Sequence, residues 1–296
     1  MNEMNASRCR DFFTVGSLRF IFAKVFFAVA VLLALEAAPM ATAESATPAL
    51  ASEPAQVSVA AAANLVHVLN ALDANFKVVA PQITVVTATG ASGSLVAQIR
   101  NGAPFDVFLS ADLDYPRALI SSGHAIAGSL TEFATGQLVL WTTSADLDIT
   151  SIEVALSSGG LRKLAIANPN TAPYGQAAKD VLDRFHLWED VQTRLVYGEN
   201  VTQAAQFVET GNADAGFVPL SIVLAPVLKH RGHWTLVPQD WHTPLTQGAV
   251  ITRRGASNPA AKRYLEFLRS PLAQKIFAEF GYLIPSSGTP AEPKTP

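Results

Sequence analysis

The feature that most constrains the fold is a repeated alternation between short apolar segments and segments whose apolar residues recur at helical spacing. Residues 57–63, 83–89 and 104–112 are apolar runs typical of buried strands, and helical patterns lie between them. After about Phe133 the alternation starts again and continues towards the C-terminus. Repeated strand–helix alternation predicts an α/β fold with mostly parallel sheets flanked by helices.

The same patterns give the expected elements and their ends. In the first block, a helix follows Asn64, which suits its N-cap, and a second helix runs from Ser92 to the Asn101-Gly102 stop. Later strands are expected at residues 136–143, 163–169, 195–200, 213–221 and 248–254. Later helices are expected at residues 173–185, at 201–212 with Asn200 as its cap, and at 259–280, notched by Pro271.

The first 43 residues have the pattern of an export signal. Basic residues precede an apolar run from Val25 to Leu35, and Ala41-Thr42-Ala43 is a small-x-small cleavage motif. The alternative is a membrane anchor, but the run has about half of the ~20 residues that a span needs, and Glu36 ends it. We therefore predict a signal peptide cleaved after Ala43 and a periplasmic product.

The number of cysteines and the net charge argue against several other classes of exported protein. The single Cys9 precedes the apolar run, so the mature chain would have no disulfide and no lipid-attachment cysteine. Removal of residues 1–43 moves the formal net charge from -3 to -4. A mildly acidic chain does not favour nucleic acid or an anionic membrane as partner.

Two blocks of alternation in an exported chain without disulfides predict two lobes that face each other across a ligand cleft. We expect a flexible leader at residues 44–56 and a disordered tail at residues 286–296. Lobe one is expected to comprise residues 57–133 plus a returning segment, residues 248–285. Lobe two is expected at residues 134–247, and two crossover strands would form the hinge.

Four turns share one physical character, because each follows a strand and opens a helix. They are centred on Asn64, Ser92, Tyr174-Gly175 and Asn200-Val201, two in each block. A helix N-terminus presents unpaired N–H groups and about half a positive charge. In open α/β sheets, ligands gather at the carboxyl ends of strands. The four turns therefore predict a site for an anion held by neutral donors.

The motifs that carry these turns resemble a known family. In chain order they are AAAN, GASGSLVAQIRNGAPFDVFLSAD, APYGQAAKDVL and ENVTQAAQFVETGNADAGFV, behind a signal peptide. This arrangement is similar to the periplasmic molybdate-binding proteins of ABC transporters, over about residues 57–285. The resemblance implies a two-lobed binding protein of the type II class that captures molybdate or tungstate and has no enzymatic activity and no cofactor. It also implies an inner-membrane permease with its ATPase as partner, and we expect a monomer.

The resemblance also implies which residues hold the oxyanion. Asn64 would donate its backbone N–H and its side chain, and Ala63 would add a contact. Ser92 would give its hydroxyl and N–H, Tyr174 stands where some members have tyrosine, and Val201 would give its backbone N–H. Molybdenum or tungsten would thus be held only as the oxyanion.

One position departs from the family pattern. Some members place a ligand tyrosine where this chain has Pro219, so that hydroxyl is missing. Tyr174 can replace it from the other direction, which leaves the number of ligand contacts open.

Neutral donors suit a large dianion whose charge is spread over four oxygens. Hydrogen bonds to an ionised acceptor are roughly twice as strong as neutral ones. A smaller tetrahedral anion such as sulfate would leave some donors unpaired, at about 1–3 kcal/mol each. Phosphate carries protons at neutral pH and would need an acceptor, but the four turns contain no carboxylate other than that of Glu199, which precedes Asn200.

Two alternatives stay open at this point. The first is a binding protein for sulfate, phosphonate or ferric iron, although the five tyrosines of the chain are never adjacent, as an iron site would favour. The second is a secreted serine hydrolase that uses Ser92 or Ser94. Gly90-Ala-Ser92-Gly93-Ser94 lacks the second glycine of a nucleophile elbow, and His67 and His186 lie in helical patterns that suggest structural roles.

Overall fold

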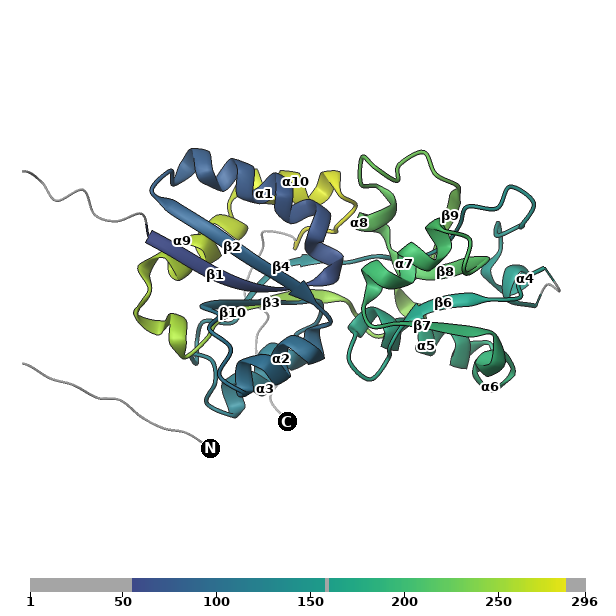
Figure 1. Cartoon of the computed structure of the whole chain (residues 1–296), viewed down its shortest axis with the longest axis horizontal. Helices are drawn as coiled ribbons and strands as arrows, with labels where there is room; N and C mark the ends of the chain where they lie inside the picture. Colours follow the sequence, from purple (N-terminus) through teal and green to yellow (C-terminus); the bar gives the residue numbers. More distant parts are fainter. Residues whose placement is uncertain (1–54, 158–159, 286–296) are drawn as a thin grey trace, which may run out of the picture. The chain divides into compact units, whose positions relative to one another are not determined.

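The computed structural model describes residues 55–157 and 160–285, all within one compact unit (Figure 1). The predicted signal peptide, most of the leader and the predicted tail lie outside the described residues. Within these ranges, no helix combines the length and apolar character needed to cross a bilayer. The described residues form two five-stranded sheets with helices packed on them.

The first sheet has the strand order β2-β1-β3-β10-β4. Its strands are β1 Ala55–Ala62, β2 Ile83–Gly90, β3 Val107–Ser110, β4 Thr131–Thr135 and β10 Thr246–Ile251. The pairs β1–β2 and β1–β3 are parallel, whereas β10 is antiparallel to both β3 and β4. Four strands therefore run in one direction and only β10 is reversed.

The second sheet repeats this plan with the order β7-β6-β8-β5-β9. Its strands are β5 Leu138–Thr142, β6 Leu164–Ala167, β7 Leu195–Gly198, β8 Ala215–Pro219 and β9 His233–Leu236. The pairs β6–β7 and β6–β8 are parallel, and β5 is antiparallel to β8 and β9. The prediction of an α/β fold with mostly parallel strand directions is confirmed.

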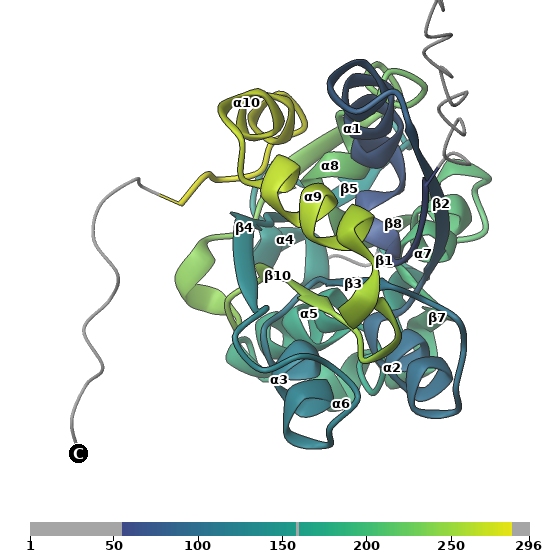
Figure 2. The ribbon, with the colours of Figure 1, turned by 90° about the vertical axis from the view of Figure 1, so that its left-hand side faces the viewer.

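Helices cover both faces of the first sheet, as Figure 2 shows. In β1, the side chains of Val57, Val59 and Ala61 join a core with α1 Val66–Val79, α9 Pro259–Leu268 and α10 Pro271–Glu279. Ala60 points the opposite way and joins a core with α2 Ser92–Arg100 and α3 Asp114–Ser121. Successive side chains of a strand point to opposite faces, and both faces are covered here, which explains why β1 is apolar from Val59 to Ala62.

The remaining α-helices belong to the second half of the chain. They are α4 Ile152–Ser157, α5 Pro173–Arg184, α6 Trp188–Val191, α7 Val201–Glu209 and α8 Leu220–Val223. The 3₁₀ turns are η1 Ala63–Leu65, η2 Gln192–Arg194, η3 Gln239–Trp241 and η4 Arg254–Ser257. Buried side chains of α5 and α7 form one apolar core with the strands of the second sheet.

The chain passes between the sheets twice, and the two crossovers are joined to each other. The first crossover leads from β4 to β5, and the second leads from β9 to β10. The backbone N–H of Gly136 on the first donates to the carbonyl oxygen of Leu245 on the second at 2.9 Å. In both sheets, the reversed strand is the one that the chain enters directly after a crossover.

The two asparagines predicted as helix N-caps differ in outcome, because their side chains have different hydrogen-bond partners. Asn200 is the N-cap of α7, because its side-chain oxygen accepts from the N–H groups of Thr202 and Gln203. The N-cap prediction for Asn64 is wrong: Ala62 occupies that position and Asn64 lies inside η1. Its side chain instead forms hydrogen bonds with residues distant in sequence, which are described below.

Candidate anion-binding site

All five residues proposed for the oxyanion line one small cavity between the ends of the two sheets. The lining residues are Ala62, Ala63, Asn64, Gly90, Ala91, Ser92, Ala111, Ala172, Pro173, Tyr174, Asn200 and Val201. Its free volume is about 10 Å³, which is room for roughly one water molecule. The lining contains no lysine, arginine, histidine, aspartate or glutamate.

The fold brings these residues together because each comes from the end of a parallel strand. β1 runs into η1, β2 runs into α2, and β7 runs into α7, while α5 follows β6 after a short loop. Four helix starts therefore point their unpaired N–H groups at one place, where their dipoles favour negative charge.

Ser92 is the first residue of α2 and is 1% exposed. Its Oγ accepts a hydrogen bond from the backbone N–H of Ala111 at 3.2 Å. A hydroxyl that accepts from a fixed amide keeps its own hydrogen to donate. Ser92 can thus offer an O–H together with a first-turn N–H, whereas Ser94 is exposed on the same helix.

Asn64 is equally buried, but its side-chain N–H groups are already used. Its Nδ2 donates to Gln247 Oε1 at 2.7 Å and to Tyr282 Oη at 3.0 Å. An amide nitrogen has two hydrogens, so both are engaged. Of the two donors expected from Asn64, the backbone N–H is therefore the one left for a ligand.

Tyr174 is 2% exposed, and its hydroxyl lies beside the first crossover. In the described part of the chain its buried hydroxyl has no hydrogen-bond partner. The hydroxyl lies so close to Gly136 that a side-chain carbon there would overlap it. Burial raises the pKa of Tyr174 well above its usual value, with a smaller contribution from Tyr282, so the O–H remains a donor at neutral pH.

Val201 opens α7, and its neighbours leave it as the available donor of that helix. Asn200 Oδ1 accepts from the N–H of Thr202 at 3.0 Å and from that of Gln203 at 3.2 Å. The first turn of a helix has unpaired N–H groups, and the cap takes two of them. The Val201 N–H remains, at the edge of the cavity.

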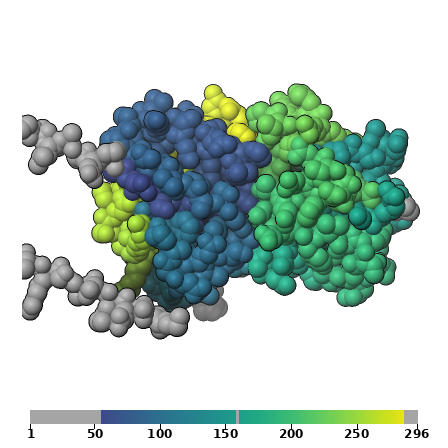
Figure 3. Space-filling view, in the orientation of Figure 1, coloured from purple at the N-terminus to yellow at the C-terminus, as the bar shows by residue number. Residues whose placement is uncertain are grey.

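Hydrogen bonds join the two sides around the cavity. The backbone N–H of Gly93 donates to the carbonyl oxygen of Thr171 at 2.8 Å, and the Thr202 hydroxyl donates to the carbonyl oxygen of Ala63 at 3.3 Å. In the space-filling view, the blue surface of the first sheet and the green surface of the second meet directly (Figure 3). The two sides are therefore in contact on this face.

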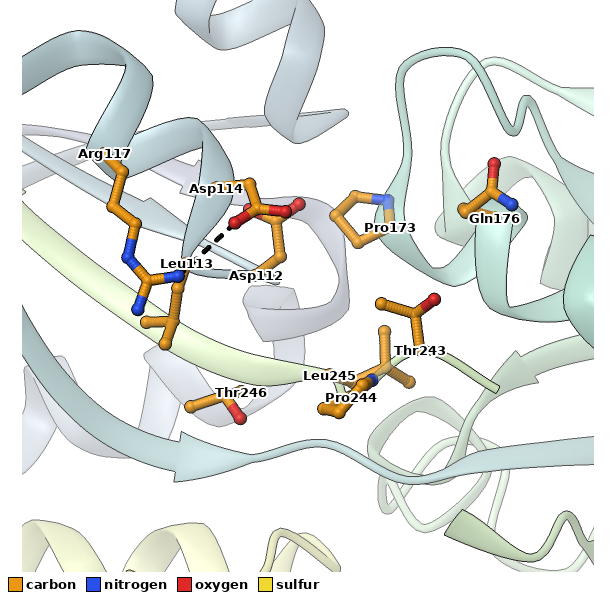
Figure 4. Close-up of a pocket in the computed structure, with 10 residues that line it drawn as sticks. All are labelled: Asp112, Leu113, Asp114, Arg117, Pro173, Gln176, Thr243, Pro244, Leu245 and Thr246. Atoms are coloured by element: carbon orange, nitrogen blue, oxygen red, sulfur yellow. Dashed lines mark hydrogen bonds and ion pairs between the residues drawn. The ribbon is translucent and has the colours of Figure 1, made fainter. Parts of the chain in front are cut away.

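A larger neighbouring cavity of about 470 Å³ has the wrong chemistry for a dianion (Figure 4). It is lined by Asp112 and Asp114, and the latter pairs with Arg117 at 3.4 Å. Burial raises the pKa of Asp112, yet two carboxyl groups at one wall still oppose an incoming anion. The small neutral cavity remains the candidate site.

A family model described as bacterial extracellular solute-binding protein matches residues 57–283. The chain belongs to this family. The match covers every cavity-lining residue, both sheets and both crossovers. The resemblance that the motifs indicated is confirmed by the relatives that follow.

This solute-binding protein is similar to two curated molybdate-binding proteins. It is 40% identical over 227 residues to molybdate-binding protein ModA of Rhodobacter capsulatus, covering 73% of this chain and 88% of the relative. It is 39% identical over 234 residues to ModA of Azotobacter vinelandii, covering 79% and 92%.

Solved structures support the same fold. The periplasmic molybdate-binding protein of Azotobacter vinelandii superposes with a TM-score of 0.73 at 35% identity, covering 77% of this chain and 99% of that one. The sulfate-binding protein SubI of Mycobacterium tuberculosis reaches a TM-score of 0.61 at 16% identity, covering 79% and 88%. The second likeness shows the shared architecture alone.

The geometry around Ser92 in this solute-binding protein does not resemble that of a serine nucleophile. Among the described residues, its Oγ bonds to a backbone amide and to no histidine. His67 lies in α1 and His186 follows α5, as the sequence patterns suggested. No group of three or more His, Cys, Asp or Glu side chains suited to a metal ion occurs in the described ranges.

Sequence reasoning missed three polar residues behind the cavity. Gln247, Ser221 and Tyr282 are all buried and all bond to Asn64. The one available signal was a glutamine at the start of the apolar segment 248–251. A buried polar group in an apolar strand needs a partner, but the sequence does not say which.

Proposed function

We propose that this protein captures molybdate or tungstate in the small cavity and delivers it to an ABC importer. The observation that carries the proposal is that one buried cavity gathers four helix starts and only neutral donors. The curated molybdate-binding relatives support the choice of ligand. We propose binding rather than catalysis, with no cofactor beyond the transported oxyanion.

The proposed donors come from both sides of the cavity. On the first side they are the N–H groups of Ala63 and Asn64 and the N–H and O–H of Ser92. On the second side they are the Val201 N–H and the Tyr174 turn. A dianion accepting all of these would satisfy groups that are otherwise buried without partners.

Ligand capture requires the two sides to move, because the free volume holds only about one water. We propose that lobe one (residues 57–133 and 248–285) and lobe two (134–247) separate at the two crossovers and close again on the anion. Closure would follow a population shift, since the bridged state makes contacts that neither side makes alone.

The cellular setting is part of the same proposal. Residues 1–43 would direct export and be cleaved after Ala43, so that a monomer works in the periplasm. The closed form would dock on an inner-membrane permease with its ATPase. No nucleic acid is involved.

A thermal-shift series on ligand-stripped residues 44–296 tests the proposal. Molybdate, tungstate, sulfate and phosphate would be compared with buffer. A ligand at a hundred times its dissociation constant stabilises the native state by about 2.7 kcal/mol, a shift of several degrees. Shifts with molybdate and tungstate alone support the proposal. Equal shifts with sulfate would refute the size selectivity, and no shift with any anion would refute the ligand class.

A further inference from the structure

One buried side chain connects both donor turns on the first side of the cavity. Gln247 lies in β10, the strand that the chain enters after its second crossover, and is 0% exposed. The register of β10 against β4 shifts between Gln247 and Gly248. Gln247 does not line the cavity, so its effect must act through other residues.

The hydrogen bonds of Gln247 fix the orientation of its amide. Its Nε2 donates to the carbonyl oxygens of Leu245 at 2.8 Å and Ala111 at 3.2 Å. Both hydrogens of Nε2 are therefore used, and Oε1 must accept. The group that faces it is Asn64 Nδ2, at 2.7 Å. The orientation of the Asn64 amide follows, because only its nitrogen can donate to Oε1.

The same glutamine also reaches Ala111, the residue whose backbone N–H binds Ser92. Gln247 binds the carbonyl oxygen of Ala111, and the N–H of Ala111 donates to Ser92 Oγ at 3.2 Å. The direction in which the Ser92 hydroxyl can donate depends on where the Ala111 N–H lies. Gln247 is thus bonded directly to Asn64 and through one residue to Ser92.

The backbone carbonyl of Asn64 is held by two further residues that are distant in sequence. Its carbonyl oxygen accepts from Ser221 Oγ at 2.9 Å and from Tyr282 Oη at 2.9 Å. All four residues are buried, and the hydrogen bonds described here between them join uncharged groups. A buried amide that loses its partner is costly, so the turn is expected to rearrange when one bond is removed.

We propose that Gln247 is a positioning residue of the anion site, which orients Asn64 and Ala111 so that affinity depends on strand β10. The inference rests on the proposed anion site but concerns a residue outside it. In this proposal the Asn64 side chain supports the turn, and the Asn64 backbone N–H is the group that donates to the anion.

The first test compares Gln247→Met with a matched control, Gln137→Met. Gln137 lies on the other crossover, and its Nε2 donates to the carbonyl oxygen of Gly281 at 2.7 Å, away from the cavity. Both variants lose a side-chain amide of the same size, which is fully buried at Gln247 and partly buried at Gln137. Titration with molybdate is expected to show a loss of about tenfold or more in affinity for Gln247→Met and under about threefold for Gln137→Met. Equal losses would overturn the proposal.

A double-mutant cycle separates positioning from general damage. In an Asn64→Ala background, Gln247→Met is expected to have little further effect on molybdate affinity, because its partner is already gone. A full additional loss in that background would show that Gln247 does not act through Asn64.

A third measurement needs no variant. In ¹⁵N-labelled wild-type protein, the side-chain N–H signals of Asn64 are expected to be protected from exchange before molybdate is added and to shift little afterwards. Rapid exchange, or a large shift on binding, would overturn the assignment. If the wild type binds no molybdate, the proposed function fails, while protection in the free protein still decides the role of Gln247.

Discussion

The two sides of the cavity are built by different means. On the second side, α7 is capped by Asn200, its own preceding residue, and α5 begins with Pro173 at its first position. On the first side, Asn64 depends on Gln247, Ser221 and Tyr282, which lie 183, 157 and 218 residues away. One side is set by local sequence and the other by tertiary structure.

This difference teaches how an uncharged site can be kept rigid. A local cap fixes a helix start without tertiary contacts, because the side chain and the N–H groups it binds are close in sequence. A long-range network must wait for both sheets to form, but it ties the donors to the crossovers. Changes to the first side should therefore affect binding most, and changes to the second side should be smaller and local.

Ser92→Ala is expected to have the largest effect on affinity. The change removes a buried O–H donor and leaves the Ala111 N–H without its acceptor. Loss of about 1–3 kcal/mol of binding corresponds to roughly ten- to a hundredfold in the dissociation constant. Titration of the variant with molybdate measures it, and Ser94→Ala on the exposed face is the control. An unchanged affinity would remove Ser92 from the donor set.

Gly93→Ala tests the contact between the two sides. An added Cβ would lie 2.6 Å from the Tyr115 hydroxyl and 3.1 Å from the Thr171 Cα. We expect about tenfold weaker molybdate binding, because overpacking costs about 1–3 kcal/mol and the contact with Thr171, on the second side, exists only in the bridged state. Melting of the ligand-free variant should change little if this state forms mainly with ligand. A similar affinity with a lower melting temperature would contradict the assignment of this contact to closure.

Asn200→Ala addresses the locally built side. Loss of an N-cap costs about 1 kcal/mol of stability, so the melting temperature should fall by a few degrees. The effect on molybdate affinity should be smaller than that of Ser92→Ala, because the Val201 N–H is part of the backbone. An affinity loss as large as that of Ser92→Ala would show that the two sides do not differ in this way.

Alkaline pH offers a comparison that needs one substitution. Burial raises the pKa values of Tyr174, Tyr264 and Tyr282 above their usual value. The folded state therefore holds these protons more tightly than the unfolded state, whose tyrosines titrate near about pH 10. The stability contribution is full below that pH and is lost as pH rises beyond it. Denaturant titrations from pH 8 to 11 should show this fall, and Tyr174→Phe should make it shallower.

Val201→Ala is expected to have the smallest effect. The proposed contribution of Val201 is its backbone N–H, which alanine retains, so affinity should change by less than about threefold. A calorimetric titration with molybdate provides the measurement. A tenfold loss would mean that the valine side chain itself shapes the cavity.

The parts that sequence reasoning predicted are those with local causes. Neighbouring residues determine the Gly-Ser turn before α2, the Asn200 cap and the alternation of strands and helices. The orientation of Asn64 is not, since its partners come from β10, α8 and the segment after α10. β9 was missed because HWTL is a short strand with little apolar pattern and mostly exposed side chains.

The contacts of the candidate site divide in the same way. Residues of each turn were recognisable, because a strand end followed by a helix start is a local pattern. Gln247 was not, because its role arises only when β10 lies beside β3 in the folded sheet. Buried long-range hydrogen bonds carry no periodicity that a single sequence displays.

A pair of calorimetric titrations tests the central claim most directly. Refolded residues 44–296, freed of ligand, would be titrated with molybdate and with sulfate in the same buffer. If neutral donors select the anion by size, molybdate should bind one to one and about thirtyfold or more tighter than sulfate, since two unpaired donors cost at least about 2 kcal/mol. Equal affinities for the two dianions would contradict the account.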